Sequence, residues 1–310
     1  MYRKMLVPLD GSELAESVFV YVKELAGGLD IDVIVLHVAI PGLDQFTPMR
    51  EAYVAQSAEK LQSDAREVQS KRTPKPKKAV KITGELAVGY PAEEILRYSE
   101  EKKIDLIVMA THGRSGLKRW SLGSVADKIL RASNIPVWLV RPGVTDAIPY
   151  DQWKERTLIV PLDGSELAEK VLPHVEVLTK QPGGKPVEVV LLRVSEPPAL
   201  PSYYVPEISE VPLNWGEYEQ QEIAKGKQAA EEYLAQIQKR LNDAGVARVK
   251  TEVIVGKADS VIVDYAGKHP CGVIVMASHG RSGISRWVYG SVAQNVLQGV
   301  SCPVFLIRPS

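Results

Sequence analysis

An internal repeat constrains this chain more than any other feature. The ten residues VPLDGSELAE at 7–16 recur unchanged at 160–169. A second segment, VMATHGRSGLKRWSLGSVADKIL at 108–130, returns at 275–297 with 15 of 23 positions identical. The halves also end alike, in IPVWLVRP and CPVFLIRP. The copies are offset by 153 and 167 residues. This period is far longer than a solenoid unit of about 20–50 residues, so it predicts a duplicated domain.

The repeat predicts two domains, at 1–143 and 155–310, which suits a chain of 310 residues. A linker that contains proline and glycine joins them. Because the second offset is larger by 14 residues, the second half carries an insertion. The stretch from Pro197 to Trp215 is long, irregular and rich in Pro and Tyr, and we expect it to cover a second site or contact a partner. Its shorter counterpart in the first half runs from Pro41 to Arg50.

Within each half, short apolar runs alternate with longer amphipathic stretches. Runs that are apolar almost throughout are typical of strands covered on both faces. Regular strand–helix alternation predicts an α/β fold with a parallel sheet of five strands in each half, helices on both faces, and a ligand crevice outside the carboxyl ends of the strands. In the first half the expected strands are Met5–Leu9, Val33–Val38, Val80–Leu86, Leu106–Ala110 and Val137–Val140, and the expected helices are Glu13–Leu25, Ala52–Gln69, Ala92–Glu101 and Ser124–Ala132. In the second half the expected strands are Thr157–Leu162, Val187–Val194, Val249–Val255, Val273–Ala277 and Val304–Ile307.

Composition argues against several partner classes. Lys plus Arg equals Asp plus Glu at 38 each, so the formal charge gives no support for binding to nucleic acid or an anionic membrane. No apolar run approaches the roughly 18 residues that a membrane span requires, and the N-terminus lacks the features of a secretory signal. The two cysteines, Cys271 and Cys302, suit a reducing compartment. They align with Ile104 and Ile135, so we expect buried, hydrophobic roles and a cytoplasmic protein.

A glycine-bearing loop follows the fourth strand of each half and leads into a helix. It has glycine, nine further residues, then Gly-Ser: Gly113 to Gly123-Ser124, and Gly280 to Gly290-Ser291. Glycine lets a backbone approach an anion closely, and a helix N-terminus favours negative charge. The pattern therefore fits a phosphate site, although the same residues could merely turn the chain and cap the helix.

These residues resemble the nucleotide-binding branch of the universal stress protein family, marked by G-x2-G-x9-G-[S/T] and an early V-P-x-D segment. The resemblance covers nearly the whole chain, twice. It implies Rossmann-like domains of the adenine nucleotide alpha hydrolase type. A dinucleotide GxGxxG and a P-loop are both absent. One departure is that alanine, at Ala110 and Ala277, replaces the first glycine of each motif, where the added Cβ could crowd the ribose.

The resemblance implies ATP or AMP as ligand, with Mg²⁺ as an optional companion, and it implies the residues that would contact the nucleotide. In the first half these are Pro8, Asp10, Val38, Met109, Ala110, Gly113, Gly123, Ser124 and Val125. In the second half they are Pro161, Asp163, Val194, Met276, Ala277, Gly280, Gly290, Ser291 and Val292.

Some of these residues also have a structural interpretation. Asp10 and Asp163 could serve as helix N-caps, since Asp is a preferred cap. His112 and His279 invite a catalytic interpretation because histidine titrates near neutrality. The sequence places no carboxylate or nucleophile beside either histidine, so we expect structural roles for both.

The resemblance favours a stress-response regulatory protein that binds nucleotide in each domain, acts as a sensor or adaptor for a protein partner, and has no catalytic residues. It also implies that the domains pack as a pseudo-dimer through their last strands, with further homo-oligomerisation left open. A slow ATPase or phosphotransferase is the first alternative, and Asp10 and Asp163 are the only motif-matched acids for it. A structural stress protein that has lost nucleotide binding is the second.

Overall fold

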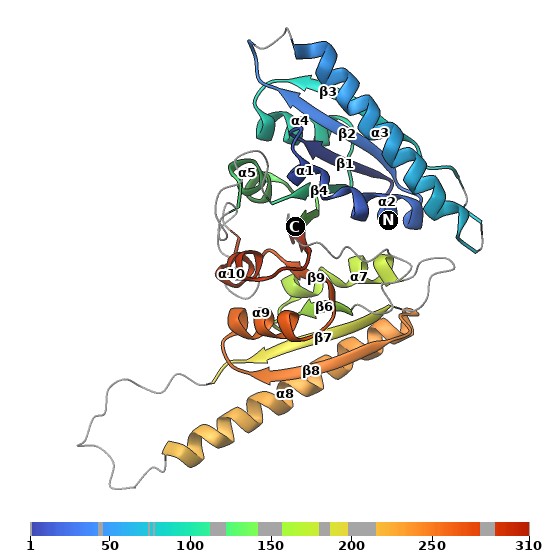
Figure 1. Ribbon diagram of the computed structural model, residues 1–310. Helices are drawn as coiled ribbons and strands as arrows, with labels where there is room; N and C mark the ends of the chain where they lie inside the picture. Colours follow the sequence, from blue (N-terminus) through green and yellow to red (C-terminus); the bar gives the residue numbers. More distant parts are fainter. Residues whose placement is uncertain are drawn as a thin grey trace.

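The computed structural model of the protein describes residues 2–42, 46–73, 75–76, 78–111, 122–141, 157–179, 187–197, 215–279 and 289–309 (Figure 1). The elements of the first half are β1 (Lys4–Leu9), α1 (Glu13–Glu16), α2 (Phe19–Leu29), β2 (Asp32–Ala39), α3 (Thr47–Ser70), β3 (Ile82–Val88), α4 (Pro91–Glu101), β4 (Leu106–Ala110), α5 (Ser124–Ala132) and β5 (Val137–Val140). Those of the second half are β6 (Thr157–Pro161), α6 (Glu166–Glu169), α7 (Leu172–Thr179), β7 (Glu188–Ser195), α8 (Trp215–Asp243), β8 (Val249–Val255), α9 (Ala258–Lys268), β9 (Cys271–Ala277), α10 (Ser291–Gly299) and β10 (Val304–Ile307).

All ten strands belong to one sheet, in the order β3-β2-β1-β4-β5-β10-β9-β6-β7-β8. Every pairing within a half is parallel, as the strand–helix alternation predicts. Among the described strands, the one antiparallel pairing joins β5 to β10, the last strands of the two halves. The α/β fold with five parallel strands per half is therefore confirmed.

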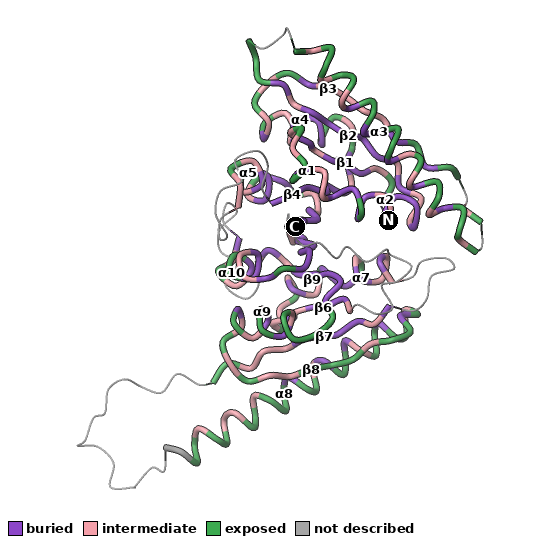
Figure 2. The backbone as a smooth tube through the Cα atoms, in the orientation of Figure 1, coloured by how far each residue is buried: buried purple, intermediate pink, exposed green. Residues whose placement is uncertain are grey.

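The sheet is covered on both faces because successive strand residues point to opposite sides. Met5 and Val7 of β1 pack with helices α2 and α3, whereas Leu6 packs in a second cluster with α4 and α5. The second half repeats this arrangement, with α7 and α8 on the first face and α9 and α10 on the other. Figure 2 shows buried residues along the central strands and exposed ones along the outer sides of α3 and α8.

The seam between the halves is built from aromatic and arginine side chains. Trp138 of β5 lies opposite Phe305 of β10, both are fully buried, and their ring centroids are 5.3 Å apart. Arg141 donates from Nη1 to the carbonyl oxygen of Val300 at 2.8 Å, and Arg308 donates from Nη1 to that of Arg131 at 2.7 Å. The last arginine of each half thus caps the C-terminal end of the other half's last helix, where cations are favoured. The expected pairing of the last strands is present in this seam.

Two predicted elements differ from the structure. The helix expected at Glu13–Leu25 is divided, because α1 ends after one turn and the Ser17 hydroxyl donates to the Leu14 carbonyl oxygen at 2.7 Å, which competes with helix continuation. The loop expected at Pro41–Arg50 is partly helical, since α3 begins at Thr47 with a proline in its first turn, where the fixed φ suits a helix.

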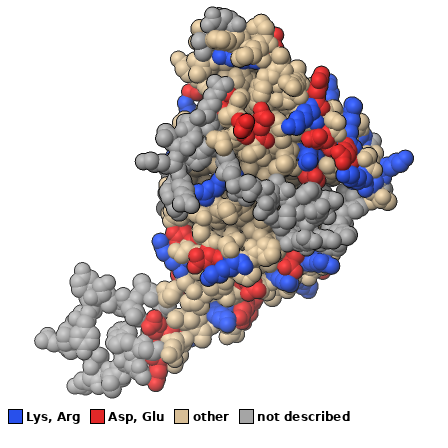
Figure 3. Space-filling model, in the orientation of Figure 1, with Lys and Arg blue, Asp and Glu red and all other residues tan. Residues whose placement is uncertain are grey.

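The two cysteines behave as the sequence indicates. Cys271 and Cys302 are both buried as free thiols, and both belong to the cluster on the α9 and α10 face. No helix among the described residues is long and apolar enough to cross a membrane. On the face shown in Figure 3, basic and acidic side chains are interspersed, in keeping with the balanced formal charge.

Candidate functional site

Each half has a cavity at the carboxyl ends of its parallel strands. The first has a volume of about 350 Å³ and lies where β1, β2 and β4 end. The second has a volume of about 690 Å³ and lies where β6, β7 and β9 end. Both volumes fall in the range of about 300–1,000 Å³ that is usual for small-molecule sites. The crevice expected from the alternation of strands and helices is therefore present twice.

The predicted site residues that the structure describes lie around these two cavities. Those that line the first are Pro8, Asp10, Val38, Met109, Ala110, Gly123, Ser124 and Val125. Those that line the second are Pro161, Asp163, Val194, Met276, Ala277, Gly290, Ser291 and Val292. Gly113 and Gly280, together with His112, lie outside the described residues. That these residues contact a nucleotide stays a prediction.

The Asp-Gly-Ser loop after the first strand of each half has a defined geometry. The Asp10 Oδ1 atom accepts from the Ser12 backbone N–H at 3.0 Å and from the Ser12 hydroxyl at 2.6 Å. Ser12 in turn accepts from the Ala15 N–H at 3.2 Å and is the N-cap of α1. Gly11 has φ +82°, a backbone conformation that favours glycine. Asp10 therefore orients the cap and is not itself the cap.

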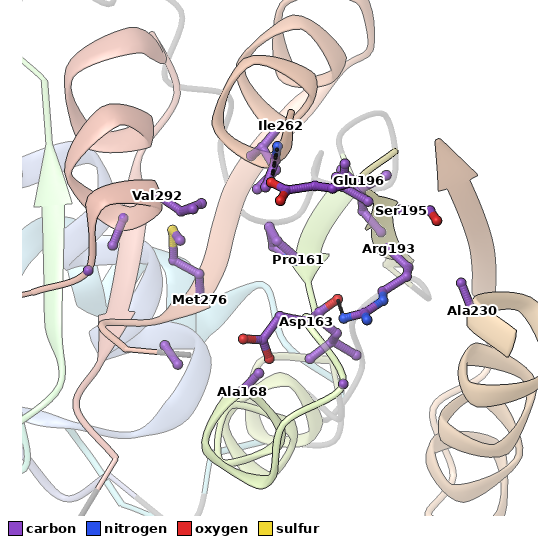
Figure 4. Close-up of a pocket in the computed structure, with 18 of the residues that line it drawn as sticks. Pro161, Asp163, Ala168, Arg193, Ser195, Glu196, Ala230, Ile262, Met276 and Val292 are labelled. Atoms are coloured by element: carbon purple, nitrogen blue, oxygen red, sulfur yellow. Dashed lines mark hydrogen bonds between the residues drawn. The ribbon is translucent and has the colours of Figure 1, made fainter. Parts of the chain in front are cut away.

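The second copy repeats this loop closely. Asp163 accepts from Ser165 at 3.0 Å and 2.6 Å, Ser165 caps α6, and Gly164 has φ +79°. The N-cap interpretation of the two aspartates is thus wrong in detail, because a serine two residues later takes that position. In Figure 4 the Asp163 carboxylate extends toward the Met276 side of the cavity.

A helix N-terminus closes one end of each cavity. Gly123 and Gly290 are the N-caps of α5 and α10, and neither helix has a side-chain hydrogen bond at its cap. The first N–H groups of a helix have no intrahelical partner, and the helix dipole adds partial positive charge there. Each cavity therefore offers an anion site at this end.

Among the described residues, nothing requires glycine at position 290. Its φ of −60° is accessible to every residue. Within that part of the chain, an added Cβ would meet only the Ser278 carbonyl oxygen, at 3.5 Å, which is ordinary van der Waals contact. The absence of a side chain at this position instead keeps the cavity wall open beside the helix N-terminus.

A hydrogen bond that the sequence analysis did not anticipate fixes the floor of each cavity. His37 on β2 donates from Nδ1 to the Leu9 carbonyl oxygen at 2.9 Å. At the equivalent position of β7, Arg193 donates from Nη1 to the Leu162 carbonyl oxygen at 3.1 Å (Figure 4). Both acceptors directly precede the cavity aspartate. An alignment of β2 with β7 would have shown His37 and Arg193 as matched polar residues within apolar runs.

The long helix after the second strand also contributes residues that the sequence analysis did not identify. Arg50 of α3 lines the first cavity, and Tyr233 of α8 lines the second. The Tyr233 hydroxyl donates to Glu169 at 3.3 Å, and burial raises the pKa of this tyrosine above its ordinary value, so it remains a donor at neutral pH. The 3.6-residue period of these helices could have indicated which of their residues face the cavity.

Histidine and carboxylate positions offer limited chemistry. His279 lines the second cavity, and its Nδ1 atom lies 2.9 Å from the Ser278 hydroxyl oxygen. Within the described residues, no group of three His, Cys, Asp or Glu side chains could hold a metal ion.

Comparison with known proteins gives the same family for both halves. The model of the universal stress protein family matches residues 1–141 and 155–308. A universal stress protein of Methanocaldococcus jannaschii is 32% identical over 142 residues, which covers 46% of this chain and 83% of that protein. The crystal structure of a universal stress protein from Archaeoglobus fulgidus covers 99% of this chain and 98% of its own, with a TM-score of 0.67 and 19% identity, and so shares the fold.

One solved member of the family contains a nucleotide. It is a protein from Arabidopsis thaliana with AMP bound, which is 18% identical, covers 46% of this chain and 92% of its own, and has a TM-score of 0.32. That ligand is a property of the plant protein. The family match over both halves, with the shared fold, shows that this chain belongs to the universal stress protein family.

Proposed function

We propose that this chain is a regulatory protein that binds an adenine nucleotide, ATP or AMP, at one site in each half. The observation that carries the proposal is Gly290 at the second cavity, where none of the described residues requires glycine. A glycine of this kind is expected where a ligand approaches the backbone closely. Its position at the N-cap of α10 favours an anion as that ligand.

The rest of each cavity suits a nucleoside. Val38 and Met109 in the first half, like Val194 and Met276 in the second, give apolar surface for a flat base. The carboxylates of Asp10 and Asp163 supply acceptors for ribose hydroxyl groups. The phosphates then lie at the α5 and α10 N-termini, and the base lies toward β2 or β7.

The proposed role is regulatory because binding can change partner affinity without catalysis. A nucleotide shifts a conformational equilibrium only if it binds the two states unequally. We propose that the halves act as domains 1–143 and 155–310, in the cytoplasm, with a regulatory protein as the partner. The buried free thiols of Cys271 and Cys302 agree with a reducing compartment.

Calorimetric titration with ATP and with AMP tests the proposal. We expect one binding event per half, and loss of the second event in Ser291→Glu. A carboxylate in the first turn favours the helix but repels a phosphate, at a cost of about 1–3 kcal/mol for charges roughly 5 Å apart. The affinity of that site should therefore fall about tenfold or more.

Gln294→Glu is the matched control, because it adds the same charge to the same helix at an exposed position that does not line the cavity. It should leave both events intact. Ser124→Glu should remove only the first event. Equal loss in Ser291→Glu and Gln294→Glu, or no binding by the wild type, would contradict the proposal.

A further inference from the structure

The two cavities are built alike but differ about twofold in size, at about 350 Å³ and 690 Å³. Their shared parts, the Asp-Gly-Ser loops and the helix N-termini, have matching geometry. The difference must therefore come from residues that the halves do not share.

The long helices α3 and α8 can be aligned from a contact that both make. The Tyr53 hydroxyl donates to Glu16, and the Tyr233 hydroxyl donates to Glu169, the same position of the repeated segment. Each ring also lies beside the matched residue of the second strand, His37 or Arg193. Tyr53 therefore corresponds to Tyr233, and within this alignment Arg50 corresponds to Ala230.

This pair of positions explains the difference in volume. Arg50 lines the first cavity with a long side chain. Ala230 lines the second cavity together with Gly226 and Ala229, and these small residues leave that side open. In Figure 4, Ala230 of α8 lies across the cavity from Met276 and Val292. The extra space is therefore at the α8 end, opposite the N-terminus of α10.

The side chains at the α8 end of the second cavity favour an uncharged group. Glu196 lines it, with a carboxylate that accepts from the Ala258 N–H at 3.3 Å, and Asp163 adds a second negative charge. Arg193 supplies one positive charge, held against the Leu162 carbonyl oxygen, with its guanidinium 5.9 Å from the centroid of the Tyr233 ring. An additional phosphate would face the carboxylates, whereas a flat apolar group can pack on small side chains and the ring.

We propose that the two sites select different ligands. The first accepts an unmodified adenine nucleotide, and the second also accepts one that carries a bulky uncharged group on its base. This inference rests on the proposed function, which directs the phosphates to α10 and the base toward β7, against which α8 packs. Arg50 restricts the first site, and Ala230 opens the second.

Titration calorimetry with ATP and with N6-benzyl-ATP tests this difference. The wild type should bind ATP at both sites and N6-benzyl-ATP at one. Ala230→Arg copies the first half into the second and should weaken N6-benzyl-ATP binding by about tenfold or more. Ala224→Arg, at an exposed α8 position outside the cavity lining, is the control and should retain it.

The reciprocal change guards against loss of folding. Arg50→Ala should create a second binding event for N6-benzyl-ATP, a gain that a damaged fold cannot produce. Equal binding of N6-benzyl-ATP at both wild-type sites, or at neither while ATP binds both, would overturn the inference and leave the proposed function standing. Failure of ATP itself to bind would overturn both.

Discussion

Acidification should weaken the seam between the halves through one histidine. His174 of α7 accepts a hydrogen bond at Nδ1 from the Tyr2 hydroxyl and packs edge-on against Phe305, with ring centroids 5.8 Å apart. Burial lowers the pKa of His174 from 6.5 to about 4. Because the folded pKa lies below the unfolded one, the unfolded chain takes up this proton first. The associated stability is complete above pH 6.5 and is lost as the pH falls toward 4.

The size of the effect follows from the two pKa values. The full difference corresponds to about 3 kcal/mol. His174 is half-buried, so solvent screening reduces the contribution, and we expect a loss of about 1–2 kcal/mol in the free energy of unfolding between pH 7 and pH 4.5.

Urea denaturation at a series of pH values measures this loss, with His174→Gln as the comparison. The glutamine carbonyl can accept from the Tyr2 hydroxyl but does not titrate. The difference in unfolding free energy between wild type and variant should change by about 1–2 kcal/mol over this interval. A constant difference from pH 7 to pH 4.5 would refute the assignment of this pH dependence to His174.

Three substitutions test the packing and the helix terminus. Phe305→Ala removes a fully buried ring that contacts Trp138, so it should lower the free energy of unfolding by about 3–5 kcal/mol in urea titrations. A loss below about 1 kcal/mol would contradict the role of Phe305 in the seam. Gly84→Ala would put a Cβ atom 2.3 Å from the Val54 carbonyl oxygen, so it should displace α3 and lower the melting temperature measured by circular dichroism. An unchanged melting temperature would show that α3 does not lie this close to β3. Gly290→Val should lower the melting temperature by only a few degrees, since valine is a poorer N-cap than glycine, but should abolish nucleotide binding at the second site in calorimetry. A large loss of stability would show that the fold needs this glycine.

The strands were predictable because of their surroundings. A strand such as β4, buried at all five positions, must be apolar on both faces, so its sequence stands out from the flanking polar segments. The duplication strengthened each assignment, since the same pattern occurs twice. The family motifs then pointed to residues that do converge on cavities, because the carboxyl ends of parallel strands meet at one edge of the sheet.

The remaining features depend on contacts that local patterns do not encode. The division of α1 from α2 comes from the Ser12 cap and the Ser17 hydroxyl, two polar residues that a helical period tolerates. The links from His37 and Arg193 to backbone carbonyls cross between strands about 30 residues apart in sequence. The difference in cavity size depends on how α3 and α8 lie over the sheet, which only the packed structure defines.

The nucleotide content of the purified protein tests the central claim most directly. The chain is purified without added nucleotide and denatured, and the released small molecules are identified and counted by chromatography and mass spectrometry. The account predicts adenine nucleotide, as ATP or AMP, in an amount that approaches one per site, and less of it from Ser291→Glu. No adenine nucleotide in the released material, together with no binding of ATP or AMP in a calorimetric titration, would contradict the claim.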